Sequence, residues 1–186
     1  MKCNTNLLTK ALLSTTLIAS STLFAAAQIS FGGEPASFRQ PTNSLRSTGA
    51  NKVIEVRPDF NPDDMQSVQV WDAQQVHVKP LIIGRTIATD INFARDAKRV
   101  TLDDGTLVYR LTVDVKGAKA NVLYYDDFFI PQNAGELYIY TPDRKKVLGK
   151  YTYETHPTHG TFATEPLPGT TAVLEYRPAL NSQEMP

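Results

Sequence analysis

Alternation of apolar and polar residues is the feature that most limits the fold of this chain. It is clearest over residues 107–115, where apolar side chains alternate with Arg110, Thr112 and Asp114. Side chains in a β-strand point alternately to opposite faces, so this period predicts a strand with one buried face. The predicted buried face comprises Leu107, Tyr109, Leu111, Val113 and Val115. Its expected core partners are Leu137, Ile139 and Leu174.

Shorter runs of the same kind recur along the chain, with turn sequences between them. Asp103-Asp104-Gly105 is one turn, because glycine adopts positive φ at low cost, and Thr141-Pro142-Asp143-Arg144 is another, because proline pre-sets φ. No helical repeat is sustained after residue 27. About eight to ten strands at this spacing predict an all-β fold, and we expect an antiparallel β-sandwich or jelly-roll-like single domain over residues 52–178. Strands other than 107–115 are expected within residues 53–57, 66–70, 76–82, 87–93, 120–129, 136–140, 147–153 and 172–176.

Residues 1–27 have the pattern of a cleaved secretory signal peptide, with a short core helix as the alternative. Lys2 and Lys10 introduce a modest apolar stretch without acidic residues, and Ala25-Ala26-Ala27 supplies small residues before cleavage at Gln28. Residues 28–51 are rich in glycine, serine, proline and asparagine. They predict a flexible leader that is dispensable for folding, of which one short stretch can pair with the domain. Residues 179–186 are expected to form a tail.

Charge and cysteine content exclude several classes of function. The 19 basic and 19 acidic residues give a formal net charge of zero, which argues against nucleic-acid binding. Cys3 is the only cysteine and precedes the apolar stretch, so we expect neither a lipid anchor nor a disulfide after cleavage. The apolar stretch is also shorter than the roughly 20 residues of a membrane span. The sequence therefore predicts an exported protein, periplasmic, outer-surface or extracellular, without a transmembrane segment after signal cleavage.

Side chains with obvious catalytic or metal-binding chemistry are few. His156 and His159 have a spacing that suits a metal only on one helical face, and Pro157 lies between them, so a solvated loop is the simpler interpretation. Ser67 and Ser182 lack the glycine-flanked context of a hydrolase nucleophile. We therefore expect no catalytic residue.

Acidic pairs and tyrosines leave two binding alternatives open. Aspartates in loops can ligate calcium, but turn and strand-edge aspartates are common without a metal. Tyrosines on strands can form a sugar-binding platform or, more simply, pack across strands. The acidic pairs are Asp63-Asp64, Asp103-Asp104 and Asp126-Asp127, and the tyrosines are Tyr138, Tyr140, Tyr151 and Tyr153. We assign no cofactor and no metal ligand from the sequence.

Several motifs follow one another in an order that resembles a known family. They are Val108-Tyr-Arg-Leu-Thr-Val-Asp-Val-Lys-Gly-Ala118, Phe128-Phe-Ile-Pro-Gln-Asn-Ala-Gly-Glu-Leu-Tyr-Ile-Tyr-Thr-Pro-Asp143, Val147-Leu-Gly-Lys-Tyr-Thr152, Phe162-Ala-Thr-Glu-Pro-Leu-Pro-Gly169 and Ala172-Val-Leu-Glu-Tyr176. This order, over residues 53–178, resembles the domain found ahead of the catalytic domain in secreted bacterial serine endopeptidases of the lysyl endopeptidase type. One departure is Phe162-Ala-Thr-Glu-Pro166, where the family usually has an aromatic residue followed directly by Thr-Pro.

The resemblance implies a non-catalytic exported domain, similar to the pro- or accessory region of such a peptidase. It would act as a folding aid, an inhibitor or a docking module, and its implied partner is a trypsin-like catalytic domain in cis or in trans. These 186 residues contain no counterpart of that catalytic domain, so no triad residue is carried over and the chain itself is not expected to be an enzyme. The alternatives are a secreted or cell-envelope binding module for a glycan or protein, and a structural domain of an envelope assembly.

Overall fold

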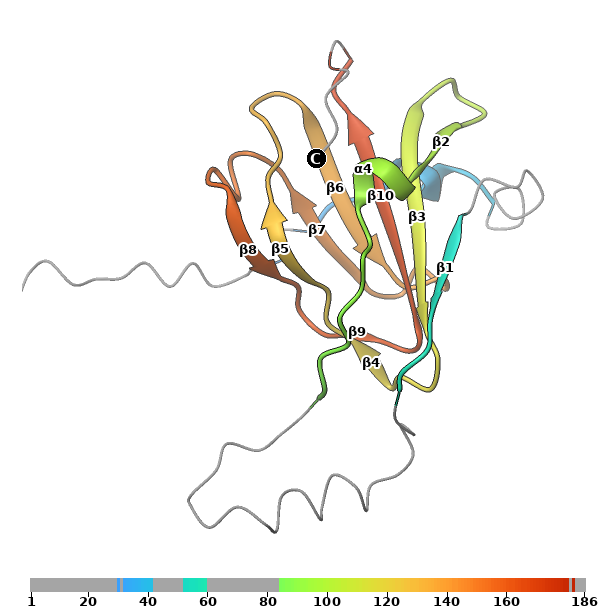
Figure 1. Ribbon diagram of the computed structural model, residues 1–186. Helices are drawn as coiled ribbons and strands as arrows, with labels where there is room; N and C mark the ends of the chain where they lie inside the picture. Colours follow the sequence, from blue (N-terminus) through green and yellow to red (C-terminus); the bar gives the residue numbers. More distant parts are fainter. Residues whose placement is uncertain (1–29, 31, 42–51, 60–83, 181, 183–186) are drawn as a thin grey trace, which may run out of the picture.

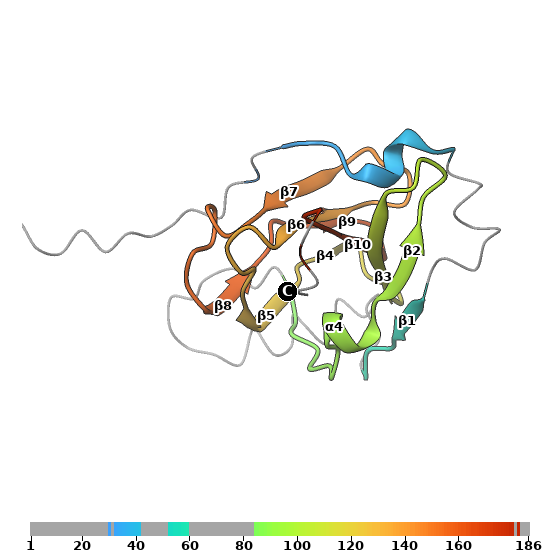
Figure 2. The same ribbon diagram turned by 90° about the horizontal axis from the view of Figure 1, so that it is seen from above.

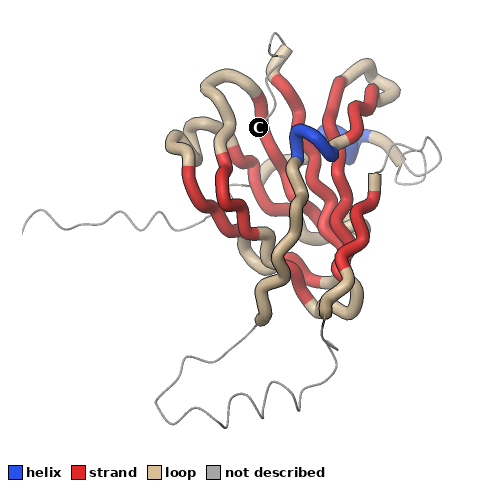
Figure 3. Tube along the Cα trace, in the orientation of Figure 1, coloured by secondary structure: helices blue, strands red, loops and turns tan. Residues whose placement is uncertain are grey.

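The described part of the chain consists mainly of strands (Figures 1 and 3), and it contains two short helical segments. The computed structural model describes residues 30, 32–41, 52–59, 84–180 and 182, and these alone are discussed below. The all-β class predicted from the sequence is confirmed. In chain order the elements are η1 (Ala36–Arg39), β1 (Val53–Val56), α4 (Phe93–Asp96), β2 (Lys98–Thr101), β3 (Leu107–Val115), β4 (Ala120–Asn121), β5 (Tyr124–Phe128), β6 (Gly135–Tyr140), β7 (Val147–Tyr151), β8 (Gly160–Ala163), β9 (Leu167–Pro168) and β10 (Thr171–Pro178).

Six strands form the main sheet, in which β3, β10 and β6 are central. The order is β1-β3-β10-β6-β7, and β2 also pairs with β3. Strand β10 is antiparallel to both of its neighbours, and its Leu174 lies opposite Leu111 of β3 and Ile139 of β6. All three side chains are buried, so this part of the predicted core is confirmed.

The pairing of β1 with β3 is parallel, so the prediction of a purely antiparallel fold is wrong for this strand. The register runs from Val53 opposite Thr112 to Val56 opposite Val115. Strand β2 pairs antiparallel with the first half of β3, along the same edge. Parallel neighbours require a long crossover, and about 50 residues separate β1 from β3, which is more than the minimum for such a connection.

The inner face of the main sheet packs against two small sheets, β4–β9 and β5–β8, and against residues 84–97 (Figure 2). Residues 87–93 were expected to form a strand, but they form a loop that leads into α4. The Asn92 side chain caps this helical turn, because its Oδ1 accepts a hydrogen bond from the Arg95 N–H at 2.9 Å. The buried side chains of this inner core are Val56, Leu111, Val113, Phe128, Ile130, Ala134, Leu137, Ile139, Leu148, Tyr151, Phe162, Leu167, Ala172, Leu174 and Tyr176.

The outer face is also covered, by residues 30 and 32–41, which we call the strap (blue in Figure 2). The sequence predicted these residues to belong to a flexible leader, yet Pro35, Ala36 and Ser37 are buried against the sheet. The expected polar face of β3 is consequently not exposed to solvent, and Arg110 retains only 4% exposure. The alternating pattern predicts a sheet with only one buried face, but the strap shields the second face from solvent.

Other strand boundaries differ in detail from the predicted ones. The expected strand over residues 120–129 is divided into β4 and β5, and the pairing of β5 with β8 shifts register between Tyr125 and Phe128. Strands β2, β8 and β9 were not predicted, and β9 lies where the sequence suggested a turn. The predicted strands 66–70 and 76–82, and the predicted signal peptide 1–27, lie outside the described residues. Among the described helices, neither has the length and apolar character to cross a membrane.

Candidate functional site: a buried ion pair beneath the strap

The strap forms two backbone hydrogen bonds with β7, at the edge of the main sheet. The Gly32 N–H donates to the Gly149 carbonyl of β7 at 2.7 Å, and the Lys150 N–H donates to the Gly32 carbonyl at 2.8 Å. Ser30 extends this pairing, since its hydroxyl donates to the Gly149 carbonyl at 2.8 Å and its N–H donates to Glu165 Oε1 at 3.2 Å. The strap therefore satisfies backbone groups that an edge strand would otherwise leave open.

A buried ion pair lies on the outer face beneath the strap. Arg110 of β3 and Glu175 of β10 are cross-strand partners, and their side chains are 5% and 0% exposed. Arg110 Nε lies 3.4 Å from Glu175 Oε2, and the Tyr140 hydroxyl donates to the same oxygen at 2.8 Å. Glu175 Oε1 accepts from the Ser37 N–H of the strap at 2.9 Å. A buried carboxylate is tolerated only when it is paired and hydrogen-bonded, and the strap supplies one of these bonds.

Tyr140 connects the ion pair to the strap. Its Oη accepts from Arg110 Nη2 at 3.0 Å and lies 3.0 Å from Ser37 Oγ. Burial raises the pKa of Tyr140, so its phenol stays protonated and donates to Glu175. Two buried nitrogens of Arg110, Nε and Nη1, have no hydrogen-bond partner among the described residues, although Nε lies within ion-pair distance of Glu175. Such a covered cluster is suited to holding a polypeptide segment in place.

Arg144 holds the C-terminal half of the strap through its carbonyl groups. It lies in the turn between β6 and β7, where the sequence predicted a turn, and its Nη1 donates to the Gln40 carbonyl at 2.8 Å. Nη1 and Nη2 also donate to the carbonyls of Phe38 and Ser37, at 3.4 and 3.2 Å. The guanidinium carbon lies 4.9 Å from the centre of the Phe38 ring, which in turn meets Tyr140 edge-on at 5.0 Å.

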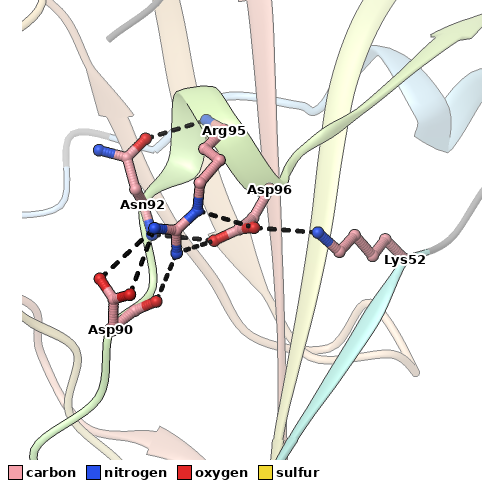
Figure 4. A network of polar contacts seen from close by, with 5 residues as sticks. All are labelled: Lys52, Asp90, Asn92, Arg95 and Asp96. Carbon is pink, nitrogen blue, oxygen red and sulfur yellow. Dashed lines mark hydrogen bonds and ion pairs between the residues drawn. The ribbon is translucent and has the colours of Figure 1, made fainter.

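A second polar cluster joins α4 to the start of β1 (Figure 4). The Asp96 carboxylate accepts from Arg95 Nη2 at 2.8 Å, from Lys52 Nζ at 2.9 Å and from the Asn92 N–H at 3.0 Å. Arg95 also forms an ion pair with Asp90, at 3.3 Å. The hydrogen bond from Arg95, followed by that from Lys52, holds the pKa of Asp96 well below its ordinary value. All these donors come from the protein, so the cluster is a clamp between α4 and β1.

The predicted solvated loop around His156 is packed on one side. The His156 ring meets the Phe162 ring edge-on at 4.5 Å, and Phe128 and Tyr151 at 5.5 Å each. Burial in this aromatic cluster lowers the pKa of His156. Its Nδ1 lies 3.0 Å from Thr155 Oγ1.

His159 points to a different environment, so the two histidines do not converge on one site. Its ring stacks on Phe129 with centroids 3.8 Å apart, and its Nδ1 lies 3.3 Å from Asp127 Oδ1. Both His159 and Asp127 are exposed. Within the part of the chain that the structure describes, no three or more histidine, cysteine or acidic side chains form a group that could hold a metal ion.

The tyrosine platform considered from the sequence is not formed. Tyr138, Tyr140 and Tyr151 are buried, and burial raises the pKa of Tyr138 and Tyr151 to about 12. Of the acidic pairs, Asp104 accepts from the Thr106 N–H at 2.9 Å and forms an ion pair with Arg39 of the strap at 3.3 Å. Asp63, Asp64 and Ser67 lie outside the described residues.

The sequence did not reveal Arg110 and Glu175 as partners. Each is a charged residue in an apolar strand, which suggests a solvent-facing position, and nothing in the local pattern shows that a distant segment covers both. No protein-family model matches this chain, and no curated protein or solved structure does so either. The interpretation of the site therefore depends on its own geometry.

Proposed function

We propose that this chain is a non-catalytic, exported β-sandwich domain that acts by docking to another polypeptide. In this proposal it is the counterpart of the pro- or accessory region of a lysyl endopeptidase-type serine peptidase. Two arguments support it. One is the order of motifs over residues 53–178, and the other is the way in which the domain holds a polypeptide segment on its outer face.

The observation that carries the proposal is recognition of main-chain groups by buried or half-buried side chains. Glu175 accepts from a strap N–H, Arg144 donates to three strap carbonyls, and the backbone of Gly149 pairs with Gly32. Contacts of this kind bind the main chain of a polypeptide segment without acting on it chemically. In the same region, the Tyr140 phenol donates a hydrogen bond to the Glu175 carboxylate.

A docking domain of this type would assist a catalytic domain through differential affinity. A ligand that binds the native state and not the unfolded state stabilises the native state by RT ln(1 + [L]/Kd), which is about 2.7 kcal/mol at a hundredfold excess over Kd. The same binding energy, directed at a native-like intermediate, would raise the yield of folded peptidase.

The test is direct binding to a catalytic domain. The full chain would be titrated calorimetrically into a lysyl endopeptidase-type catalytic domain whose active-site serine has been blocked, with a digestive trypsin treated identically as the control. Saturable binding to the first enzyme, a higher refolding yield in its presence and no comparable effect on trypsin are expected. Absence of binding and of any change in refolding yield would reject the proposal. So would hydrolysis of a lysine-containing peptide by this chain that persists through repurification.

A surface-binding role is the second candidate, and a separate observation favours it. Val122 and Tyr124 are 54% and 64% exposed on adjoining parts of the chain, and the stacked pair of Phe129 and His159 also reaches the surface. Exposed aromatic rings stack on sugar rings and on apolar protein surfaces. Binding of the labelled chain to a glycan array, abolished by Tyr124→Ala and retained by Val53→Ala, would favour this candidate over the docking function.

A further inference from the structure

The strap is held as a peptide ligand would be held. Its contacts with the rest of the domain are backbone pairing at Gly32, hydrogen bonds from Arg144 to its carbonyls, and burial of three consecutive residues. The bonds from Ser37 to Glu175 and Tyr140 each join parts of the chain more than 100 residues apart. The strap is therefore bound by parts of the domain that are distant from it in the sequence, as a peptide from another chain would be.

The outer face selects the strap by its side chains as well as by its backbone. Gly33 has φ of +119°, and a Cβ atom there would come within 2.9 Å of Tyr138 Oη, so a larger residue would strain the backbone and force the Tyr138 side chain to shift. Ser37 uses both its N–H and its hydroxyl, and Phe38 packs between Tyr140 and Arg144. The outer face thus recognises glycine, serine and phenylalanine at these three positions.

An uncovered outer face would be unfavourable. Without the strap, the Glu175 carboxylate loses the hydrogen bond from the Ser37 N–H, and Arg144 loses the three carbonyls to which it donates. Buried or half-buried charged groups with too few partners destabilise a protein, so the face favours occupation by a segment that turns as η1 does and offers a suitable N–H.

We propose that the outer face of the main sheet is a polypeptide-binding site that takes, in trans, the strap of a second copy of this chain. The second copy offers the same glycine, serine and phenylalanine, so the exchanged arrangement repeats every contact described above. Both arrangements use the same strap and the same face, taken from one copy or from two. A short tether gives the strap an effective concentration of about millimolar, so the wild-type chain keeps its own strap at low concentration, and exchange dominates once the intramolecular contact is weakened.

Two full-length variants with complementary defects test this exchange. Ser37→Pro removes the strap N–H and hydroxyl but leaves the outer face intact, whereas Arg144→Ala removes the contacts of the face to the strap carbonyls but leaves the strap intact. One variant would carry ¹⁵N, and the mixture would be analysed by native mass spectrometry. In the mixed dimer one strap–face contact is intact and the other carries both defects, whereas each homodimer has two contacts with one defect each. We expect the heterodimer to exceed either homodimer by roughly tenfold, because a single defect already disrupts its contact and a second defect in the same contact adds little. A monomeric mixture, or equal amounts of all three dimers, would overturn the proposal.

A peptide assay gives an independent measurement. A fluorescent peptide of residues 30–41 should bind the Ser37→Pro chain saturably and bind the wild-type chain at least about tenfold more weakly, because the wild-type strap competes in cis. The matched control peptide carries Gly33→Val. If Ser37→Pro loses its β-sheet circular dichroism, Phe38→Ala replaces it as the strap-defective chain. Absence of saturable binding to a folded strap-defective chain, or equal binding of the control peptide, would overturn the proposal. Neither result would affect the docking function, because this exchange needs no catalytic domain.

Discussion

Glu175→Ala is expected to lower the free energy of unfolding by about 3–5 kcal/mol, the range for losing one member of a buried ion pair. The Glu175 side chain is 0% exposed and that of Arg110 is 5% exposed, so the change leaves a guanidinium with almost no access to water. It also removes the acceptor of the Tyr140 hydroxyl and of the Ser37 N–H. The unpaired buried charge and the two unpaired donors all lower the free energy of unfolding.

The double replacement Arg110→Met with Glu175→Leu isolates the effect of the unpaired charge. It removes both charges and keeps much of the side-chain volume, so the only remaining penalty is the pair of donors from Tyr140 and Ser37 that lose an acceptor. We expect a loss of about 1–2 kcal/mol, smaller than that of Glu175→Ala alone.

Urea unfolding followed by far-ultraviolet circular dichroism measures both effects. With a slope of about 2 kcal/mol per molar urea, a loss of about 4 kcal/mol lowers the midpoint by about 2 M. The control is Glu55→Ala, since Glu55 is a strand glutamate whose ion pair with Arg57 is exposed to solvent, and its midpoint should shift little. The reasoning would be refuted if Glu175→Ala resembled this control, or if the double variant were less stable than Glu175→Ala.

Four further changes test other parts of the structure. Leu111→Ala should cost about 2–5 kcal/mol in urea unfolding, because Leu111 is fully buried, and a loss below about 1 kcal/mol would contradict its place in the core. Arg144→Ala should expose residues 30–41 to limited proteolysis while residues 84–178 stay protected, whereas unchanged cleavage would show that Arg144 does not hold the strap. Burial lowers the pKa of His156, so its neutral form stabilises the folded state. This stabilisation is complete above the unfolded pKa of about 6.5 and is lost as pH falls below it. The urea midpoint should therefore drop from pH ~8 to pH ~5.5, and a similar drop in His156→Gln would contradict this cause. Asp96→Asn should lower the melting temperature at neutral pH and lower it less in strong acid. The reason is that the low pKa of Asp96 keeps its charged form bonded to Arg95 through most of the acid range. Identical melting curves of the variant and the wild-type chain at neutral pH would refute the clamp.

Alternation was sufficient to predict the central strands and their inner core. Leu111, Ile139 and Leu174 lie in one cross-strand row because their strands have a clear period of two and well-marked turns. The loop over residues 87–93 was misread for a physical reason. Its apolar residues Ile87 and Ile91 pack on the core, as those of a strand would, but their backbone does not pair with another strand.

The candidate site could not be predicted from the alternation of apolar and polar residues. Glycine, proline and serine in residues 32–41 indicate a loose segment by composition, yet the same small residues allow close approach to Tyr138 and burial of Ser37. The bonds that hold the segment connect it to β7 and β10, and no local period carries information about such distant partners. Composition measures how much apolar surface a segment can bury, and the strap depends largely on hydrogen bonds.

The bond between Ser37 and Glu175 spans 138 positions, and β10, which carries Glu175, lies between β3 and β6 at the centre of the main sheet. During synthesis the strap therefore emerges long before its binding face, which is complete only after the last strand has been made. Contacts so distant in sequence give a high contact order, and folding is slowed because the entropy of closing long loops is lost before the contacts form. A chain with this order of events folds late and as a whole, so its strands stay open to contact with other polypeptides until synthesis has passed β10.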